Sequence, residues 1–115
     1  MRSIFTFSFI FFSICLSAQI VSINPSEAKA DDEITITFDA NEGTAGLVGA
    51  TKVYMHSGII TDGPNGVDWQ NVVGNWGQDD GIGEMEKVNG ESDKWQITIT
   101  PRDYYSASTN TTIFR

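Results

Sequence analysis

The chain has 115 residues, of which 40% are hydrophobic, and its 15 acidic residues outnumber the seven basic ones to give a formal charge of −8. A chain of this length forms one ordinary domain and is far shorter than the roughly 250 residues of a catalytic barrel. Nucleic acid and anionic membranes are poor partners, because both repel a negatively charged surface.

The first residues have the pattern of a secretory signal peptide. Arg2 provides a short positive flank, and an apolar run over residues 4–16 precedes small and polar residues. The run is too short for a membrane-spanning helix, which needs about 20 apolar residues. We expect cleavage after Ala18, which leaves residues 19–115 as a secreted or cell-surface chain with no membrane anchor. Loss of Arg2 leaves six basic and 15 acidic residues, a formal charge of −9.

Cys15 is the only cysteine, and it lies within the segment that we expect to be removed. The mature chain then carries neither a disulfide nor a thiol-based site. In the alternative of a lipoprotein, Cys15 becomes the acylated first residue. The bulky residues before it disfavour this alternative, because such signals have small residues there.

Alternating apolar and polar residues predict short β-strands along the chain. A leading strand precedes a turn at Pro25, and in the next run Ile34, Ile36 and Phe38 point to one face. Further strands are predicted over residues 51–58, 94–100 and, more weakly, 83–88. Turn clusters rich in Gly, Asn, Asp and Pro separate these runs, and no stretch has a sustained helical period with caps. We therefore predict an all-β fold, an immunoglobulin-like β-sandwich.

The last five residues, TTIFR, have the composition of a strand in progress. Ile113 and Phe114 are followed by no turn and no polar tail. An apolar strand seldom closes a domain, because its partner and the protecting edge would be missing. We expect the sequence to be truncated within a domain that contains at least one more strand.

Few residues of the mature chain suit catalysis. His56 is its only histidine, and no serine lies in a G-x-S-x-G motif. The number of acidic residues is large enough for a glycosidase-like pair of an acid and a base, so the count alone does not exclude one. Most of these carboxylates, however, fall in turns, where they usually cap the turn and are solvated. We expect no enzymatic activity of this chain and no cofactor.

Two acidic loops contain the hard oxygen ligands that calcium prefers. These residues are Asp62, Asn65, Asp68, Asp79, Asp80 and Glu84. Neither loop has the spacing of an EF-hand, and Asp or Asn before Gly is an ordinary turn former. We favour turn formation over metal binding and predict no metal site.

The aromatic residues offer the clearest binding signal. Trp69 and Trp76 lie seven residues apart in WQNVVGNWGQDDG, a polar stretch that does not have the pattern of a regular strand or helix. On the predicted strand over residues 51–58, a period of two places Tyr54 and His56 on the face opposite Val53 and Met55. Outward-facing aromatic residues beside this loop would form a shallow platform.

A pyranose ring presents apolar C–H faces to such a platform, and its hydroxyls bond to neighbouring amides. Asn71, Asn75 and Gln78 lie in the same loop and provide amides. The sequence leaves packing and binding equally open for Trp69 and Trp76, which could also cap the end of a sandwich. Trp95 alternates with Ile97 and Ile99, which places it in the core.

Residues 33–115 resemble a known family through their order of motifs: VYMHSG, a loop with two tryptophans, GEM, KWQITITP, YY and a late FR. Domains at the start of secreted bacterial α-amylases have this order. More distantly, it is similar to the starch-binding modules of families twenty-five and twenty-six. The resemblance implies that His56, Trp69 and Trp76 stack on glucose rings and that Trp95 is structural. It also implies a short turn and a closing strand after the late FR.

The resulting prediction is non-catalytic binding of starch or a related α-glucan, by the front part of a secreted amylase or a surface glucan-binding protein. A polysaccharide is then the partner, with a possible catalytic domain after residue 115. The predicted ligand-binding residues are Tyr54, His56, Trp69, Trp76, Asn75 and Gln78. One alternative is a structural spacer that packs against a glycoside hydrolase domain and buries Tyr54, Trp69 and Trp76. Another is a contribution to the active site of a longer enzyme.

Overall fold

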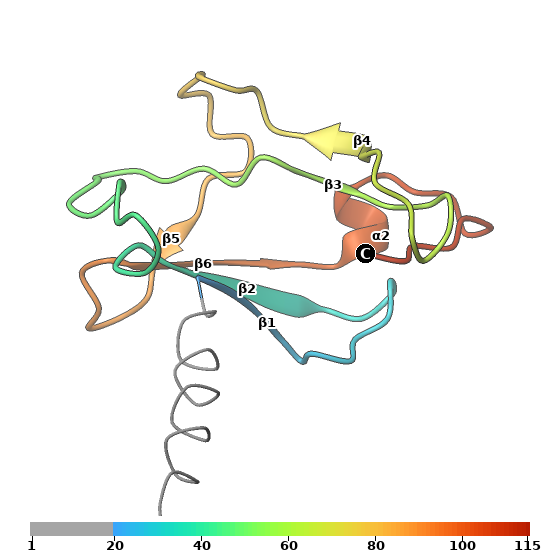
Figure 1. The fold of residues 1–115 in the computed structure, drawn as a ribbon, viewed down its shortest axis with the longest axis horizontal. Helices are drawn as coiled ribbons and strands as arrows, with labels where there is room; N and C mark the ends of the chain where they lie inside the picture. Colours follow the sequence, from blue (N-terminus) through green and yellow to red (C-terminus); the bar gives the residue numbers. More distant parts are fainter. Residues whose placement is uncertain (1–19) are drawn as a thin grey trace, which may run out of the picture.

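The computed structural model describes residues 20–115, and their regular structure is almost entirely antiparallel β (Figure 1). The elements of this part are β1 (Val21–Asn24), β2 (Ile34–Asp39), β3 (Ser57–Ile59), β4 (Gln70–Val73), β5 (Glu86–Lys87), β6 (Lys94–Ile99) and α2 (Pro101–Tyr104). The predicted all-β class is therefore confirmed. The predicted signal peptide, its cleavage after Ala18, and Cys15 lie outside the described residues.

A four-stranded sheet in the order β1-β2-β6-β5 forms one layer. At its centre β2 pairs with β6, so that Ile36 lies opposite Ile97 and Phe38 opposite Trp95. The hydroxyls of the cross-strand pair Thr35 and Thr98 lie 2.9 Å apart on the other face. Because residues two apart share a face, the predicted alternation gives this sheet one apolar side.

The second layer consists of the two-stranded sheet of β3 and β4, which lies above the four-stranded sheet in Figure 1. Ile59 of β3 is almost fully buried and packs against Ile34, Ile36 and Ile99 of the first layer. A second cluster joins Val53 and Met85 to Trp95. The core therefore lies between the two layers, and it confirms the prediction that Trp95 is a core residue.

The prediction of a strand over residues 51–58 is only partly correct, because regular pairing begins at Ser57. Before it, Tyr54 makes a single bridge with Glu84. The amide of Met55 donates to the carbonyl of Gly83 at 2.8 Å, and the amide of Met85 donates to the carbonyl of Val53 at 2.9 Å. Gly83 has a φ of +83°, outside the range of a strand, so its turn interrupts the ladder.

The stretch after Trp69 was predicted to be irregular, which is wrong for residues 70–73, because they form β4. The register shifts between Ser57 and Ile59 where the two strands pair. Opposite this shift Asn71 has a φ of +51°, a conformation that Asn tolerates better than most residues. The irregular backbone hides the alternation on which recognition of a strand from sequence depends.

The single turn of α2 is not predicted by the sequence, which has no helical period there. Pro101 occupies its first turn, where the missing amide of proline removes no hydrogen bond. The side chain of Arg102 then joins distant segments, with Nε 2.8 Å from Oδ1 of Asp31 and Nη1 2.9 Å from the carbonyl of Thr111. A helix of one turn is too short to produce a period in the sequence.

The segment TTIFR lies beside β3 without forming a regular strand. The amide of Phe114 donates to the carbonyl of Ile60, and the amide of Ile60 donates to the carbonyl of Arg115, both at 2.8 Å. Ile113 packs against the main core cluster. Within residues 20–115, no helix has the length and apolar composition needed to cross a bilayer.

We predict that Trp95→Ala lowers the free energy of unfolding by about 3–5 kcal/mol, because it leaves a cavity between the layers. Trp95 is 3% exposed, whereas Trp76 is 83% exposed. The control Trp76→Ala should therefore change the free energy of unfolding by less than about 0.5 kcal/mol. Urea unfolding followed by circular dichroism measures both values, and equal destabilisation would contradict the assignment.

Candidate binding site

Five of the six predicted ligand-binding residues line one hollow of about 450 Å³. They are Tyr54, His56, Asn75, Trp76 and Gln78. Trp69, the sixth, lies on the other side of His56 and lines a neighbouring hollow. The structure thus brings together residues that are up to 24 positions apart in the sequence.

Two segments form this hollow, residues 54–56 and the loop over residues 74–82, and Gly74 allows them to approach closely. A Cβ at Gly74 would lie 3.0 Å from Nδ1 of His56 and 3.2 Å from the carbonyl oxygen of Met55. Its φ of +114° is also unsuited to residues with a side chain. The loop over residues 74–82 can therefore pass directly over His56.

His56 lies between the two loop tryptophans. Its ring centroid is 6.1 Å from that of Trp69, with 43° between the planes, and 5.6 Å from that of Trp76, in an edge-on arrangement. Such distances and tilts are favourable for aromatic pairs. Nδ1 of His56 is buried and has no hydrogen-bond partner among the described residues, so packing orients the ring.

Neither loop tryptophan belongs to the core. Trp69 is 54% exposed and Trp76 is 83% exposed. The sequence left packing and binding equally open for both indoles. Exposure of so much indole surface costs solvation free energy, which is typical of surfaces that bind another molecule.

The outer part of the loop is held by Asp79, for which the sequence predicts only turn formation or calcium ligation. Its carboxylate accepts hydrogen bonds from the Tyr54 hydroxyl and from Nζ of Lys52, the latter at 3.1 Å. The bond from Tyr54, followed by that from Lys52, lowers the pKa of Asp79 below its ordinary value of 3.8. The same bond to Asp79 raises the pKa of Tyr54.

Asp80 holds the inner part of the same loop. It accepts hydrogen bonds from Nδ2 of Asn75 at 2.7 Å and from the amide of Ile82 at 3.0 Å. The bond from Asn75, followed by that from Ile82, lowers the pKa of Asp80. The loop is therefore shaped by its own carboxylates before any ligand arrives.

These contacts divide the predicted residues into two groups. The Tyr54 hydroxyl and the Asn75 amide are engaged with Asp79 and Asp80, so they position the loop. His56, Trp76 and Gln78 line the hollow without such side-chain bonds to carboxylates. Asn71, whose amide was considered for sugar binding, donates instead to the carbonyl of Tyr105 at 3.0 Å.

The acidic loops do not converge into a metal site in the described part of the chain. Among residues 20–115, no group of three or more His, Cys, Asp or Glu side chains is arranged to hold a metal ion. Asp79 and Asp80 are instead bonded to donors of the protein.

A family model described as Domain of unknown function (DUF8578) matches residues 21–115. The chain belongs to this family. No curated protein and no solved structure matches the chain. The match covers every described strand, so the DUF8578 domain includes both layers and the site between residues 54 and 82.

Sequence reasoning missed Lys52, Met55, Asp79 and Ile82 as parts of the site of this DUF8578 domain. Met55, Asp79 and Ile82 line the hollow. Lys52 could have been found, because a period of two places it on the same face as Tyr54. The role of Asp79 had no signal, since its partners lie 25 and 27 residues away.

We predict that Tyr54→Phe raises the pKa of Asp79 toward 3.8, because the strongest hydrogen bond to its carboxylate is lost. Lys52→Met should also raise this pKa, because it removes both a hydrogen bond to the carboxylate and a nearby positive charge. Carboxyl carbon NMR titration measures the pKa. Tyr104→Phe is the control, since Tyr104 makes no bond to Asp79.

The sign of the pH effect follows from the lowered pKa. A depressed pKa in the folded protein stabilises the loop above the unfolded value of about 4, and this contribution is lost as the pH falls through the folded value. In the Tyr54→Phe protein, the stability of this loop should therefore change less as the pH falls. An unchanged pKa of Asp79 in the Tyr54→Phe protein would contradict the hydrogen bond between the Tyr54 hydroxyl and Asp79.

Proposed function

We propose that this domain is secreted and binds starch or a related α-glucan without catalysing a reaction. The observation that carries the proposal is the pair of exposed indoles, Trp69 and Trp76, on either side of His56. Exposed aromatic rings beside an open hollow suit the C–H faces of a pyranose ring.

Binding would combine stacking on the indoles with hydrogen bonds to sugar hydroxyls. Gln78 provides both an amide donor and an acceptor at the hollow. The carboxylates of Asp79 and Asp80 at the rim favour a neutral polysaccharide, because an anionic one would be repelled. A shallow site of this kind gives weak affinity, which linkage to a catalytic or second binding domain would make useful.

We also infer an immunoglobulin-like β-sandwich and kinship with the domains that precede secreted bacterial α-amylases. Two antiparallel layers around Trp95 support the sandwich. The order of motifs from VYMHSG to the late FR supports the kinship, including the more distant one with starch-binding modules of families twenty-five and twenty-six. In such a parent protein the domain would hold the substrate near a catalytic domain.

A structural spacer is the second candidate, and the wide exposure of apolar side chains favours it. Val67 is 79% exposed close to Trp69, and Val72 is 47% exposed. A neighbouring glycoside hydrolase domain that packs here would cover these side chains together with Trp69 and Trp76. In that case the indoles would contribute nothing to sugar binding.

We predict that the protein is retarded in native gels that contain soluble starch and that Trp76→Ala or Trp69→Ala weakens the binding by at least about tenfold. Loss of a stacked indole removes most of the apolar contact with the ring. Phe114→Ala is the matched control, because Phe114 is 41% exposed but lies outside the hollow.

Folded protein without retardation would reject glucan binding and favour the spacer. Retardation that survives both indole substitutions would place the sugar elsewhere on the domain. Circular dichroism of each variant separates these outcomes from a loss of folding.

A further inference from the structure

A second apolar feature follows the edge strand β1 between the two layers. Three hollows of about 350, 280 and 540 Å³ lie along it, and Ile36 lines all of them. Val21 and Ile23 of β1 each line two of the three. We call these three adjoining hollows the β1 furrow; Gly58, Val67 and Trp69 contribute to its opposite wall, and Tyr54, His56 and Trp76 of the candidate site also line its 280 Å³ hollow.

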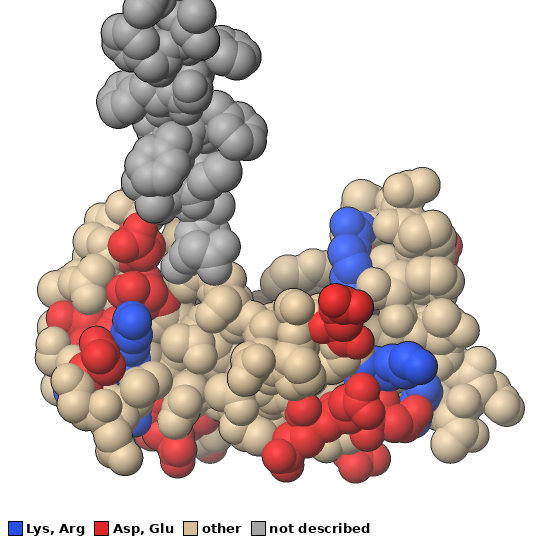
Figure 2. All heavy atoms as spheres, turned by 90° about the horizontal axis from the view of Figure 1, so that it is seen from below, with Lys and Arg blue, Asp and Glu red and all other residues tan. Residues whose placement is uncertain are grey.

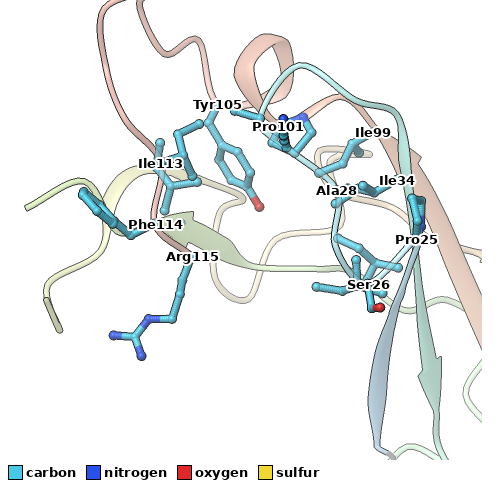
Figure 3. A pocket seen from close by; sticks show the side chains of 16 residues that line it. Pro25, Ser26, Ala28, Ile34, Ile99, Pro101, Tyr105, Ile113, Phe114 and Arg115 are labelled. Atoms are coloured by element: carbon cyan, nitrogen blue, oxygen red, sulfur yellow. The ribbon is translucent and has the colours of Figure 1, made fainter. Parts of the chain in front are cut away.

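One end of the β1 furrow is the pocket in Figure 3. There Pro25, Ala28 and Ile34 lie on one side, and Ile113 and Phe114 lie on the other. The side chain of Tyr105 points into the space between them. The two layers are therefore apart along β1, although they are packed together around Ile59 and Trp95.

Within residues 20–115 no strand pairs with the outer side of β1, which is an edge of the four-stranded sheet. The amide of Asp39 donates to the carbonyl of Ile20, so that hydrogen-bonded pairs with β2 fall on Ser22 and Asn24. Hydrogen-bonded and non-hydrogen-bonded pairs alternate in an antiparallel ladder. Val21 and Ile23 therefore direct their N–H and C=O groups outward, along the edge of the sheet.

The charges around the β1 furrow differ from those of the rest of the chain. None of the chain's 15 acidic residues lines the three hollows, and the charged residues that do are Lys29, at the Pro25 end, and Arg115, which lines two of the hollows and donates to the carbonyl of Gly66. Elsewhere acidic and basic side chains are mixed on the surface, as the face in Figure 2 shows. The lining of the furrow is thus mainly apolar, and the charged side chains that line it are both cations.

We propose that the β1 furrow binds an extended strand of a partner protein, which adds to the edge of β1 in antiparallel orientation. Alternate apolar side chains of the strand fill the furrow beside Ile36 and Trp69. An acidic residue at its amino end lies near Lys29 and Arg115, because the antiparallel strand begins where β1 ends. Strand addition at a free edge is an established mode of peptide recognition.

Charge argues for a partner of this kind over a second copy of the chain. A second copy brings its whole formal charge of −8 against the like charge of the first, a far larger repulsion than a short strand with a single carboxylate meets. A short acidic strand instead pairs its carboxylate with the two cations, and the charge fixes the orientation of the strand.

The probe for the test is a capped seven-residue peptide with aspartate at its amino end, followed by alternating valine and threonine. The control peptide carries lysine in place of the aspartate. We expect saturable one-to-one binding in isothermal titration calorimetry, with the aspartate peptide at least about tenfold tighter. Hydrogen exchange should show slower exchange of the Val21 and Ile23 amides when this peptide is bound.

Variants of the protein test the strand and the charge separately. Val21→Pro removes an outward N–H at the first position of an edge strand, where proline is tolerated, and should abolish binding. Val67→Glu places a charge in the furrow at a side chain that is 79% exposed, so it keeps the fold and should also abolish binding. Lys29→Glu combined with Arg115→Glu should reverse the preference between the two peptides.

Equal affinity for both peptides, or no binding by protein with a native circular dichroism spectrum, would overturn the proposal. Protection of the Val21 amide in the absence of peptide would also overturn it: with concentration-dependent dimerisation this result favours a second copy, and in a monomer extended past Arg115 it favours a further strand of the same chain. Starch retardation of the Lys29→Glu protein is a separate readout, because Lys29 lines neither the hollow beneath Trp76 nor the one beside Trp69.

Discussion

The pairing of β2 with β6 is the constraint on which the other elements depend. Its register places Ile34 opposite Ile99 and Phe38 opposite Trp95, so two six-residue strands share one apolar face. The second layer covers this face through Ile59 and Val53. A shift of one residue would turn every one of these side chains toward solvent.

The second layer is less regular than the first, and its irregularity makes the candidate site. After Val53 the chain stays extended but pairs through single bonds with the turn at Gly83. This arrangement leaves Tyr54 and His56 free of a neighbouring strand on one side. The loop over residues 74–82 occupies that space and is held there by Asp79 and Asp80.

The same irregularity explains why apolar surface stays exposed on both sides of His56. On one side of His56 this surface lines the hollow under Trp76. On the other side it lines the part of the β1 furrow next to Trp69. Both indoles pack on the imidazole and remain more than half exposed. The candidate site and the β1 furrow therefore meet at His56 and share Trp76, which lines hollows of both.

Sequence alone determined the all-β class, the alternation of β2 and β6, and the burial of Trp95, because period-two patterns report local geometry directly. It also selected Tyr54, His56, Asn75, Trp76 and Gln78, which the fold brings to one hollow. It misjudged β4, since the bulge at Asn71 breaks the alternation on which such predictions rest.

Only the tertiary structure decided which of these side chains face solvent and which hold the loop. The bonds of Asp79 to Tyr54 and Lys52 span 25 and 27 residues, and no local pattern encodes contacts at that separation. The exposure of Trp69 and Trp76 depends in the same way on how two distant layers meet. Local periodicity is set by neighbouring residues, whereas the site is set by packing between segments that are remote in the chain.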